Sequence, residues 1–357
     1  MTRAFTADRQ RLTALRLAAQ GIGSPAFDTP VEVARHLLAL QAQDFGGAKW
    51  GIGLRTAKAT DADVERAIGN REIVRSWPMR GTLHITAAED LGWILGLTGE
   101  RIVQSAAGRH RQLGLDGAAF ALAARVATTE LERHTVMPRT ALLAAFDAAG
   151  LSTEGQRGAH LLLYLCVTRL MVFGPVDGKQ HSFVLLDDWV RTRRDLTGDD
   201  ALAEFARRYF VSHGPASDRE FARWSSLTLT QARRGIAAVA DELEALEIDG
   251  VTYWHRAGLE PAAKGVAALP GFDEYVLGYQ ARGAQLAPEW FERIVPGGNG
   301  MFLPTLVVDG EIVGTWKRTE TVRAVRISVI PFAPIASALA PVFARYGNFI
   351  GKPVDIL

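Results

Sequence analysis

Two helical segments followed by a short apolar hairpin recur along this 357-residue chain, and this recurrence constrains its fold more than any other feature. The helix pairs are predicted at residues 9–20 and 30–41, 138–149 and 156–171, and 217–226 and 229–246. The hairpins that follow them are predicted at residues 73–86, 172–186 and 249–256. Two helices and a hairpin form the winged-helix plan, so the sequence predicts a helix-rich α+β fold with three tandem winged-helix motifs.

Turn and capping residues support these elements. The first hairpin turns at residues 78–81 and the second at 177–178, where Asp-Gly favours a tight hairpin. A hydroxyl residue followed three positions later by glutamate forms a capping box at a helix start. This spacing occurs at Thr29 with Glu32, Thr86 with Glu89, and Ser217 with Glu220. Three helix starts are predicted from it.

The C-terminal part has a different pattern. It predicts strands at 303–308 and 311–317 joined by Asp309-Gly310, a third strand at 323–329 and a helix at 335–346. The chain length predicts two or three domains. The predicted segments are winged helix 1 at 1–115, winged helix 2 at 116–195, winged helix 3 at 196–265, and a β-rich segment with a closing helix at 266–357. Periodicity leaves open an α+β enzyme of another topology.

Composition excludes several classes of protein. With 48% hydrophobic and 22% charged residues, the chain is expected to fold throughout. Arg169 interrupts the longest apolar run, residues 161–173, so no segment is expected to span a bilayer. The N-terminus lacks the apolar core of a secretory signal, and we expect a cytoplasmic protein. The net charge of +1 argues neither for nor against a nucleic-acid partner.

Metal, cofactor and hydrolase signatures are also missing. Cys166 is the only cysteine and lies in an apolar stretch, which predicts a buried core thiol. The histidines form no HExxH pattern, so we expect no metal. Residues 51–56 fail the dinucleotide motif at its third glycine, and residues 174–180 are one residue short of a phosphate loop. We therefore expect no cofactor.

Four segments, in this order, carry a resemblance to a known family. They are residues 36–45 (HLLALQAQDF), 75–84 (RSWPMRGTLH), 272–282 (FDEYVLGYQAR) and 308–318 (VDGEIVGTWKR). The first resembles the Gln-x-Gln or Gln-x-Asp catalytic segment of the AlkZ and YcaQ family of winged-helix DNA glycosylases. The others are similar to its RGTLH, FDxYLLGY and C-terminal hairpin segments. Gln43 places the chain in the Gln-x-Gln branch, which includes AlkZ.

The resemblance implies a fold, an activity and a substrate. The implied fold is three winged helices around a concave, positively charged channel for double-stranded DNA. The implied activity is hydrolysis of the N-glycosidic bond of N7-alkylguanine, including bulky adducts and interstrand crosslinks, in DNA repair or in self-resistance. Gln41 and Gln43 are the catalytic residues that it implies. We expect a monofunctional enzyme, because no lysine can be assigned to β-elimination, and we expect it to be nucleoid-associated when on DNA.

Two glutamines suit this chemistry. An N7-alkylated guanine already carries a positive charge and leaves as a neutral base, so the reaction needs a positioned water more than an acid. An amide oxygen can accept a hydrogen bond from that water, and its dipole stabilises the developing sugar cation. In an extended segment residues 41 and 43 lie on the same side, whereas Asp44, a competing base, lies on the other. Gly46-Gly47 would then allow a sharp turn or the close approach of a phosphate backbone.

Other residues are candidates for DNA contact because they lie on predicted hairpins or recognition helices. They are Arg80, His84, Arg157, Lys179, His181, Trp316 and Lys317. Side chains of this kind bind phosphates without reading sequence, which suits an enzyme that searches for lesions. Ordinary surface or packing roles remain the alternative for each of them.

Two other functions remain open at this stage. One is a winged-helix DNA-binding regulator without catalysis, although the chain shows no heptad seam for the dimer that such a regulator needs, and we expect a monomer. The other is a small-molecule enzyme or resistance protein that sequesters an alkylating natural product. Binding of such a compound without DNA would distinguish the second.

Overall fold

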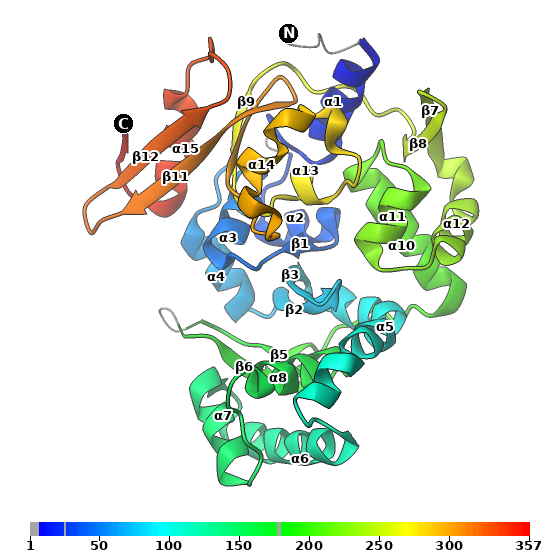
Figure 1. Ribbon diagram of the computed structural model, residues 1–357, viewed down its shortest axis with the longest axis vertical. Coiled ribbons are helices and arrows are strands. Elements are labelled where there is room, and N and C mark those ends of the chain that lie inside the picture. Colours follow the sequence, from blue (N-terminus) through cyan, green and yellow to red (C-terminus); the bar gives the residue numbers. More distant parts are fainter. Residues whose placement is uncertain (1–6, 25, 177–179) are drawn as a thin grey trace. The chain divides into compact units, whose positions relative to one another are not determined.

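The computed structural model in Figure 1 describes residues 7–24, 26–176 and 180–357. Its contacts divide the chain into two compact units. Unit 1 contains Met1–Val64 and Ala203–Leu357, and unit 2 contains Glu65–Leu202. The two ends of the chain therefore fold together, while the middle forms a unit of its own. The chain passes between the units within helices α4 (Asp61–Gly69) and α10 (Gly198–His213).

The first part of unit 1 is helical. It contains α1 (Ala7–Ala19), α2 (Pro30–Leu37), strand β1 (Leu40–Gln41) and α3 (Phe45–Gly53). The predicted capping box at the start of α2 is confirmed, because Thr29 and Glu32 each bond the other's backbone N–H. The predicted helix at 30–41 is too long. Leu38 takes a φ of 65°, which is incompatible with a continuing right-handed helix, and the chain then becomes extended.

A second group of helices precedes a two-stranded hairpin. It comprises α10, α11 (Asp218–Ser225), α12 (Leu229–Ala238), β7 (Leu243–Ile248) and β8 (Val251–Arg256). The capping box of Ser217 and Glu220 is confirmed at the start of α11. The predicted helix at 229–246 is wrong at its end. Val239 leaves the helical region with a φ of −126°, a 3-10 turn follows at Ala240–Glu242, and β7 then pairs with β8 from Leu243 onward.

The C-terminal part of unit 1 is a five-stranded sheet in the order β13-β12-β11-β10-β9. Its strands are β9 (Val266–Leu269), β10 (Thr305–Val308), β11 (Glu311–Glu320), β12 (Val325–Pro331) and β13 (Val354–Ile356). Only the β12–β13 pair is parallel among these strands of the described chain. The predicted Asp309-Gly310 turn is confirmed, with positive φ at both residues. Helix α15 (Ala340–Ile350) packs on Trp316 of the sheet. Helices α13 (Glu274–Leu277) and α14 (Phe291–Ile294) come between β9 and β10 in the sequence.

Unit 2 combines a sheet with a group of helices. Its strands follow the order β3-β2-β5-β6-β4. They are β2 (Ile73–Met79), β3 (Thr82–Ala87), β4 (Met137–Pro138), β5 (Met171–Phe173) and β6 (Ser182–Leu185). The helices are α5 (Leu91–Gln112), α6 (Gly117–His134), α7 (Arg139–Ala148), α8 (Arg157–Val167) and α9 (Leu186–Trp189). Short 3-10 turns in the two units are Ala88–Asp90, Ala240–Glu242, Arg282–Ala284, Pro288–Trp290 and Pro296–Gly298.

Most predicted elements of unit 2 are present. The hairpin β2–β3 turns at Arg80-Gly81, where both residues have positive φ. Strands β5 and β6 pair as predicted, whereas their turn at 177–178 lies outside the described residues. The capping box at Thr86 and Glu89 is wrong, because Thr86 lies inside β3. The pattern did not predict the long helices α5 and α6.

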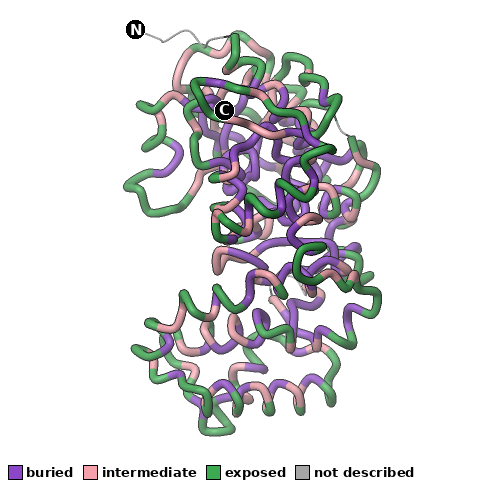
Figure 2. Tube along the Cα trace, turned by 90° about the vertical axis from the view of Figure 1, so that its right-hand side faces the viewer, coloured by how far each residue is buried: buried purple, intermediate pink, exposed green. Residues whose placement is uncertain are grey.

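The core of unit 2 is apolar and lies between α6, α7, α8 and the sheet. Its buried members include Leu142, Phe146, Leu161 and Phe183. Cys166 is fully buried in the same cluster, which confirms the predicted core thiol, and burial raises its pKa well above the usual value. Figure 2 shows how buried and exposed residues alternate along the helices.

The chain is a mixed fold rich in helices, as predicted. Two helices followed by a hairpin occur at α7–α8–β5–β6 and at α11–α12–β7–β8. The division into three winged helices and a C-terminal segment stays a prediction. Across the described residues, none of the helices combines the length and the apolar character that crossing a bilayer requires.

Candidate active site

The two glutamines lie in a short extended segment between α2 and α3. Its backbone is fixed at one end by the positive φ of Leu38 and at the other by Asp44, the N-cap of α3. Gln41 is half-buried, Ala42 is fully buried and Gln43 is exposed. In an extended chain this alternation puts the two amides on the side opposite Ala42. Gln41 ends the short strand β1 and Gln43 lies in the bend before α3, so the expected common direction of the two amides stays a prediction.

Asp44 has a structural task at the start of α3. Its carboxylate accepts a hydrogen bond from Gly47 N–H at 3.0 Å and lies 3.4 Å from the Arg318 guanidinium. A Cβ at Gly47 would lie 2.7 Å from the Asp44 carboxylate, so the cap requires glycine there. The expected turn at Gly46-Gly47 is therefore wrong, since both residues belong to the first turn of α3.

A buried carboxylate holds the backbone of the segment. Glu274 accepts a hydrogen bond from Gln41 N–H at 2.9 Å and another from Trp224 Nε1–H at 2.8 Å. His213 Nε2 lies 3.4 Å from the same carboxylate. All four partners belong to unit 1, and Glu274 is 2% exposed. Glu274 was not among the residues identified from sequence.

A buried ion pair fixes the helix that carries Glu274. Asp273 caps α13 by accepting from Tyr275 N–H at 2.9 Å. Arg55, at the end of α3, donates to both oxygens of Asp273 at 2.9 Å. It also donates to the side chain of Gln20 at 2.9 Å. A bidentate pair of this kind restricts orientation as well as distance. Helix α3, which follows the glutamine segment, and helix α13, which carries Glu274, are thus joined to each other.

Two of the candidate DNA-contact residues meet at the β2–β3 turn. Arg80 lies in the turn, and its Nη2 is 2.9 Å from His84 Nε2. His84 is fully buried and also bonds the Thr82 carbonyl at 2.8 Å. His181, next to β6, lies 3.1 Å from the Arg75 guanidinium. Burial, followed by the charge of Arg75, lowers the pKa of His181 below its usual value.

The other candidates have different surroundings. The Arg157 guanidinium donates to the carbonyls of Ser152 and Leu113, so it closes the end of α5. Lys317 is exposed on β11. Trp316 is 1% exposed, and its indole donates to the Leu269 carbonyl at 2.8 Å. Trp316 is therefore a core residue and not a DNA contact. Lys179 lies outside the described residues.

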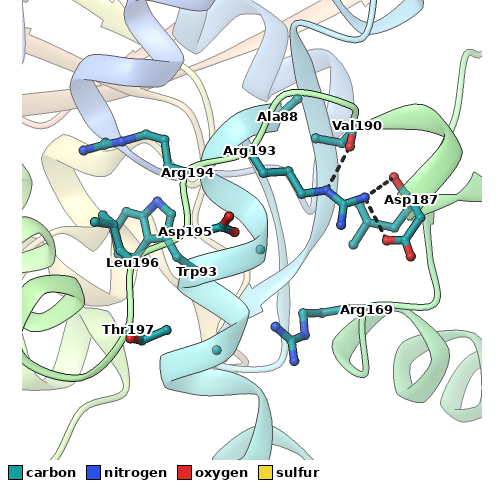
Figure 3. A pocket seen from close by; sticks show the side chains of 13 residues that line it. Ala88, Trp93, Arg169, Asp187, Val190, Arg193, Arg194, Asp195, Leu196 and Thr197 are labelled. Carbon is teal, nitrogen blue, oxygen red and sulfur yellow. Dashed lines mark hydrogen bonds and ion pairs between the residues drawn. The ribbon is translucent and has the colours of Figure 1, made fainter.

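Unit 2 contains a recess of about 360 Å³ (Figure 3). Arg169, Arg193 and Arg194 line it, together with Trp93 and Asp187. Arg193 pairs with Asp187 at 2.7 Å, and Arg194 pairs with Asp90 at 3.3 Å. Two of the three arginines thus have aspartate partners, and the recess does not select an anionic ligand. Within the described ranges, no cluster of three or more His, Cys, Asp or Glu side chains is placed to hold a metal ion.

Comparison with known proteins agrees with the sequence resemblance. A family model described as "DNA glycosylase AlkZ-like" matches residues 34–349, which include both glutamines. An "Interstrand DNA cross-link repair glycosylase" of Streptomyces sahachiroi is 28% identical over 309 residues, covering 80% of this chain and 81% of that protein.

The fold has a solved counterpart. The Streptomyces sahachiroi DNA glycosylase AlkZ matches with a TM-score of 0.80 over 99% of this chain and 100% of that chain, at 23% identity. This likeness supports the fold, and the family model, which spans most of the sequence, supports the activity. The chain belongs to the AlkZ-like family of DNA glycosylases.

Proposed function

We propose that this protein hydrolyses the N-glycosidic bond of N7-alkylguanine in double-stranded DNA, including bulky adducts and interstrand crosslinks. The observation that carries the proposal is the anchored extended segment with Gln41 half-buried and Gln43 exposed. The name of the Streptomyces relative, a cross-link repair glycosylase, supports the same class of damage. The role is DNA repair or self-resistance, on the nucleoid of the cytoplasm.

The leaving group explains why amides suffice. The alkylated base carries a positive charge that disappears as the glycosidic bond breaks, while positive charge develops on the sugar. An amide oxygen facing the sugar stabilises that charge and accepts a hydrogen bond from the attacking water. We assign Gln43, the exposed amide, to the water, and Gln41 to the sugar or to positioning. Asp44 is already engaged by Gly47 N–H and Arg318.

The partner in this proposal is double-stranded DNA held by a monomer in a positively charged, concave channel. The candidate contacts that remain are Arg80, Arg157, His181 and Lys317, together with Lys179, whereas the fully buried His84 supports Arg80 from below the surface. Phosphate contacts of this kind give affinity without sequence preference. No side chain is assigned to β-elimination, so the enzyme is proposed to be monofunctional and to leave an intact abasic strand.

The test is release of 7-methylguanine from methylated duplex DNA under single-turnover conditions. We expect the Gln43→Ala variant to lose about 100-fold or more in rate, the loss typical of removing one stabilising group at a developing charge. Circular dichroism should show an unchanged fold, and DNA affinity should be retained. If the wild-type protein binds DNA but releases no base, the proposal fails. Strand cleavage before alkali treatment would contradict the monofunctional part.

A further inference from the structure

The buried carboxylate of Glu274 joins the glutamine segment to elements far away in the sequence. Gln41 and Glu274 are 233 residues apart, and Trp224 lies 50 residues before Glu274. Glu274 and Trp224 are each at most 2% exposed, so water does not compete for these hydrogen bonds. The contact with Glu274 is made by the backbone N–H of Gln41.

We infer that Glu274 is a positioning residue for the base-excision reaction, because its carboxylate fixes the backbone at Gln41 and thereby the direction of Gln43. This inference rests on the proposed function. The bond from Gln41 N–H to the buried Glu274 restricts the backbone two residues before the exposed amide of Gln43. Displacement of a reacting group by about 1 Å can cost about 100-fold in rate.

The hydrogen-bond inventory explains why a carboxylate is required. Gln41 N–H and Trp224 Nε1–H are both donors, and each is directed to a different oxygen of Glu274. The oxygen that accepts from Trp224 also lies 3.4 Å from His213 Nε2. A carboxylate accepts on both oxygens, whereas an amide accepts on one and donates from the other. Glutamine at position 274 would therefore leave one of the two donors facing an N–H. Because both donors are buried, that conflict would displace either Trp224 or the Gln41 backbone.

The two donors that share Glu274 allow a second substitution to compensate for the loss of the carboxylate. In Glu274→Gln the two donors compete for one acceptor, so the segment loses its anchor in part of the molecules. In Glu274→Gln/Trp224→Phe the competing donor is gone, and the amide oxygen is available to Gln41 N–H. Trp224→Phe alone keeps the bond from Gln41 to Glu274. Glu292→Gln, at an exposed position on α14, is the matched control.

The experiment measures single-turnover release of 7-methylguanine, DNA affinity and melting temperature for the wild type and these four variants. We expect Glu274→Gln to release base about 100-fold more slowly with unchanged DNA affinity, and the double variant to recover most of that rate. Trp224→Phe and Glu292→Gln should stay close to the wild type. A wild-type rate in Glu274→Gln, or the absence of recovery in the folded double variant, would overturn the inference.

A measurement on the wild type keeps the inference testable even if Glu274→Gln fails to fold. In protein labelled with 15N-glutamine, the Gln41 amide should exchange slowly with solvent. Exchange at the rate of an exposed loop amide would overturn the inference. If the wild type releases no base but the Gln41 amide is protected, the proposed function fails while the anchoring itself is retained, so the two failures are distinguishable.

Discussion

The two units bury different kinds of side chain. Unit 1 contains two ion pairs in which both partners are at most 2% exposed, Arg55 with Asp273 and Arg16 with Glu220. The core of unit 2 between α6, α7 and α8 is made of leucine, phenylalanine, alanine and methionine side chains. These two pairs lie in the unit that carries Gln41 and Gln43, whereas in unit 2 the buried Asp90 pairs with the partly exposed Arg194.

The second ion pair of unit 1 illustrates how directional this core is. The Arg16 guanidinium lies 3.4 Å from Glu220 and donates to Gln285 Oε1 at 2.9 Å and to the Pro215 carbonyl at 3.0 Å. It also lies 3.7 Å from the centre of the Tyr279 ring. Each of these contacts fixes an angle as well as a distance.

This difference shows where geometric precision is concentrated. An apolar core tolerates rearrangement as long as its volume is filled. A buried ion pair adds little net stability, because desolvation offsets the attraction, but it permits only one arrangement of its partners. The apolar core of unit 2 is enough for a scaffold. Helices α3 and α13, which border and anchor the glutamine segment, need the arrangement that Arg55 and Asp273 impose.

The largest effect should come from breaking the pair that joins α3 to α13. Arg55→Met leaves Asp273 buried without its partner, and we expect a loss of about 3–5 kcal/mol in the free energy of unfolding of unit 1. Hydrogen exchange read out by mass spectrometry would report this unit by unit. Base release should also fall, because Asp273 caps the helix of Glu274.

An exposed pair in the same unit provides the control for Arg55→Met. Arg233 lies 2.7 Å from Asp218, with 61% of its side chain exposed. Arg233→Met should cost less than about 1 kcal/mol, since water screens the interaction. Equal losses of stability in Arg55→Met and Arg233→Met would mean that the buried ion pair matters no more to unit 1 than an exposed one.

Most of the fold could be predicted from local patterns. Thr29 with Glu32 defined the start of α2, and Asp309-Gly310 defined the β10–β11 turn. The boundary of α12 was missed because the pairing of β7 with β8, a tertiary interaction, replaces helical bonds after Ala238. Thr86 was assigned to a cap because the spacing alone does not reveal that it lies inside a strand.

The site could be predicted only in part. The order of the four family segments identified Gln41 and Gln43, of which Gln41 lies in the short strand β1 and Gln43 in the bend that follows it. Glu274 was missed although it lies in one of those segments, because its role depends on a contact across 233 residues. Trp316 was assigned to DNA because its position on a hairpin does not reveal which face of β11 packs on α15.

A smaller loss is expected when volume is removed from the apolar core of unit 2. Leu142 on α7 is fully buried in that core. Leu142→Ala removes buried methyl groups and leaves a cavity, which should cost about 2–5 kcal/mol in the stability of unit 2. A cost near the lower end of this range is expected if the apolar core repacks around the cavity. Hydrogen exchange should speed up in α6, α7 and α8. Faster exchange in α3 and α13 instead would contradict the independence of the two cores.

Acid should weaken unit 1 through His36. This ring on α2 donates from Nε2 to the Ala19 carbonyl at 2.6 Å, and burial lowers its pKa to about 4. The unfolded chain takes up the proton first, so stability is complete above pH 6.5 or so and falls as the pH drops towards 4. Between pH 7 and 5 we expect a loss of about 1–2 kcal/mol, reduced by the partial exposure of the ring.

A variant isolates this contribution. His36→Gln keeps a donor for the Ala19 carbonyl but does not titrate, so the dependence of unit 1 stability on pH should become shallower in this range. The measurement is urea unfolding at several pH values, with hydrogen exchange assigning the loss to a unit. An unchanged slope in the variant would show that other groups cause the acid sensitivity. Burial also lowers the pKa of His110 and His160 in unit 2, so that unit should show a dependence of the same sign.

The smallest difference between the units should appear at helix caps, where local geometry matters more than the kind of core. Asp116 caps α6 in unit 2 by accepting from Ala119 N–H at 2.8 Å, and Thr29 caps α2 in unit 1 through its bond with Glu32 N–H. Asp116→Ala and Thr29→Ala should each cost about 1 kcal/mol in the stability of their own unit, because each leaves one helix donor without its side-chain acceptor. Thr29→Ser is the matched control and should stay close to the wild type. A cost several times larger for Thr29→Ala would mean that the start of α2 is coupled to the buried charges of unit 1, and the contrast between the two cores would then extend to the surface.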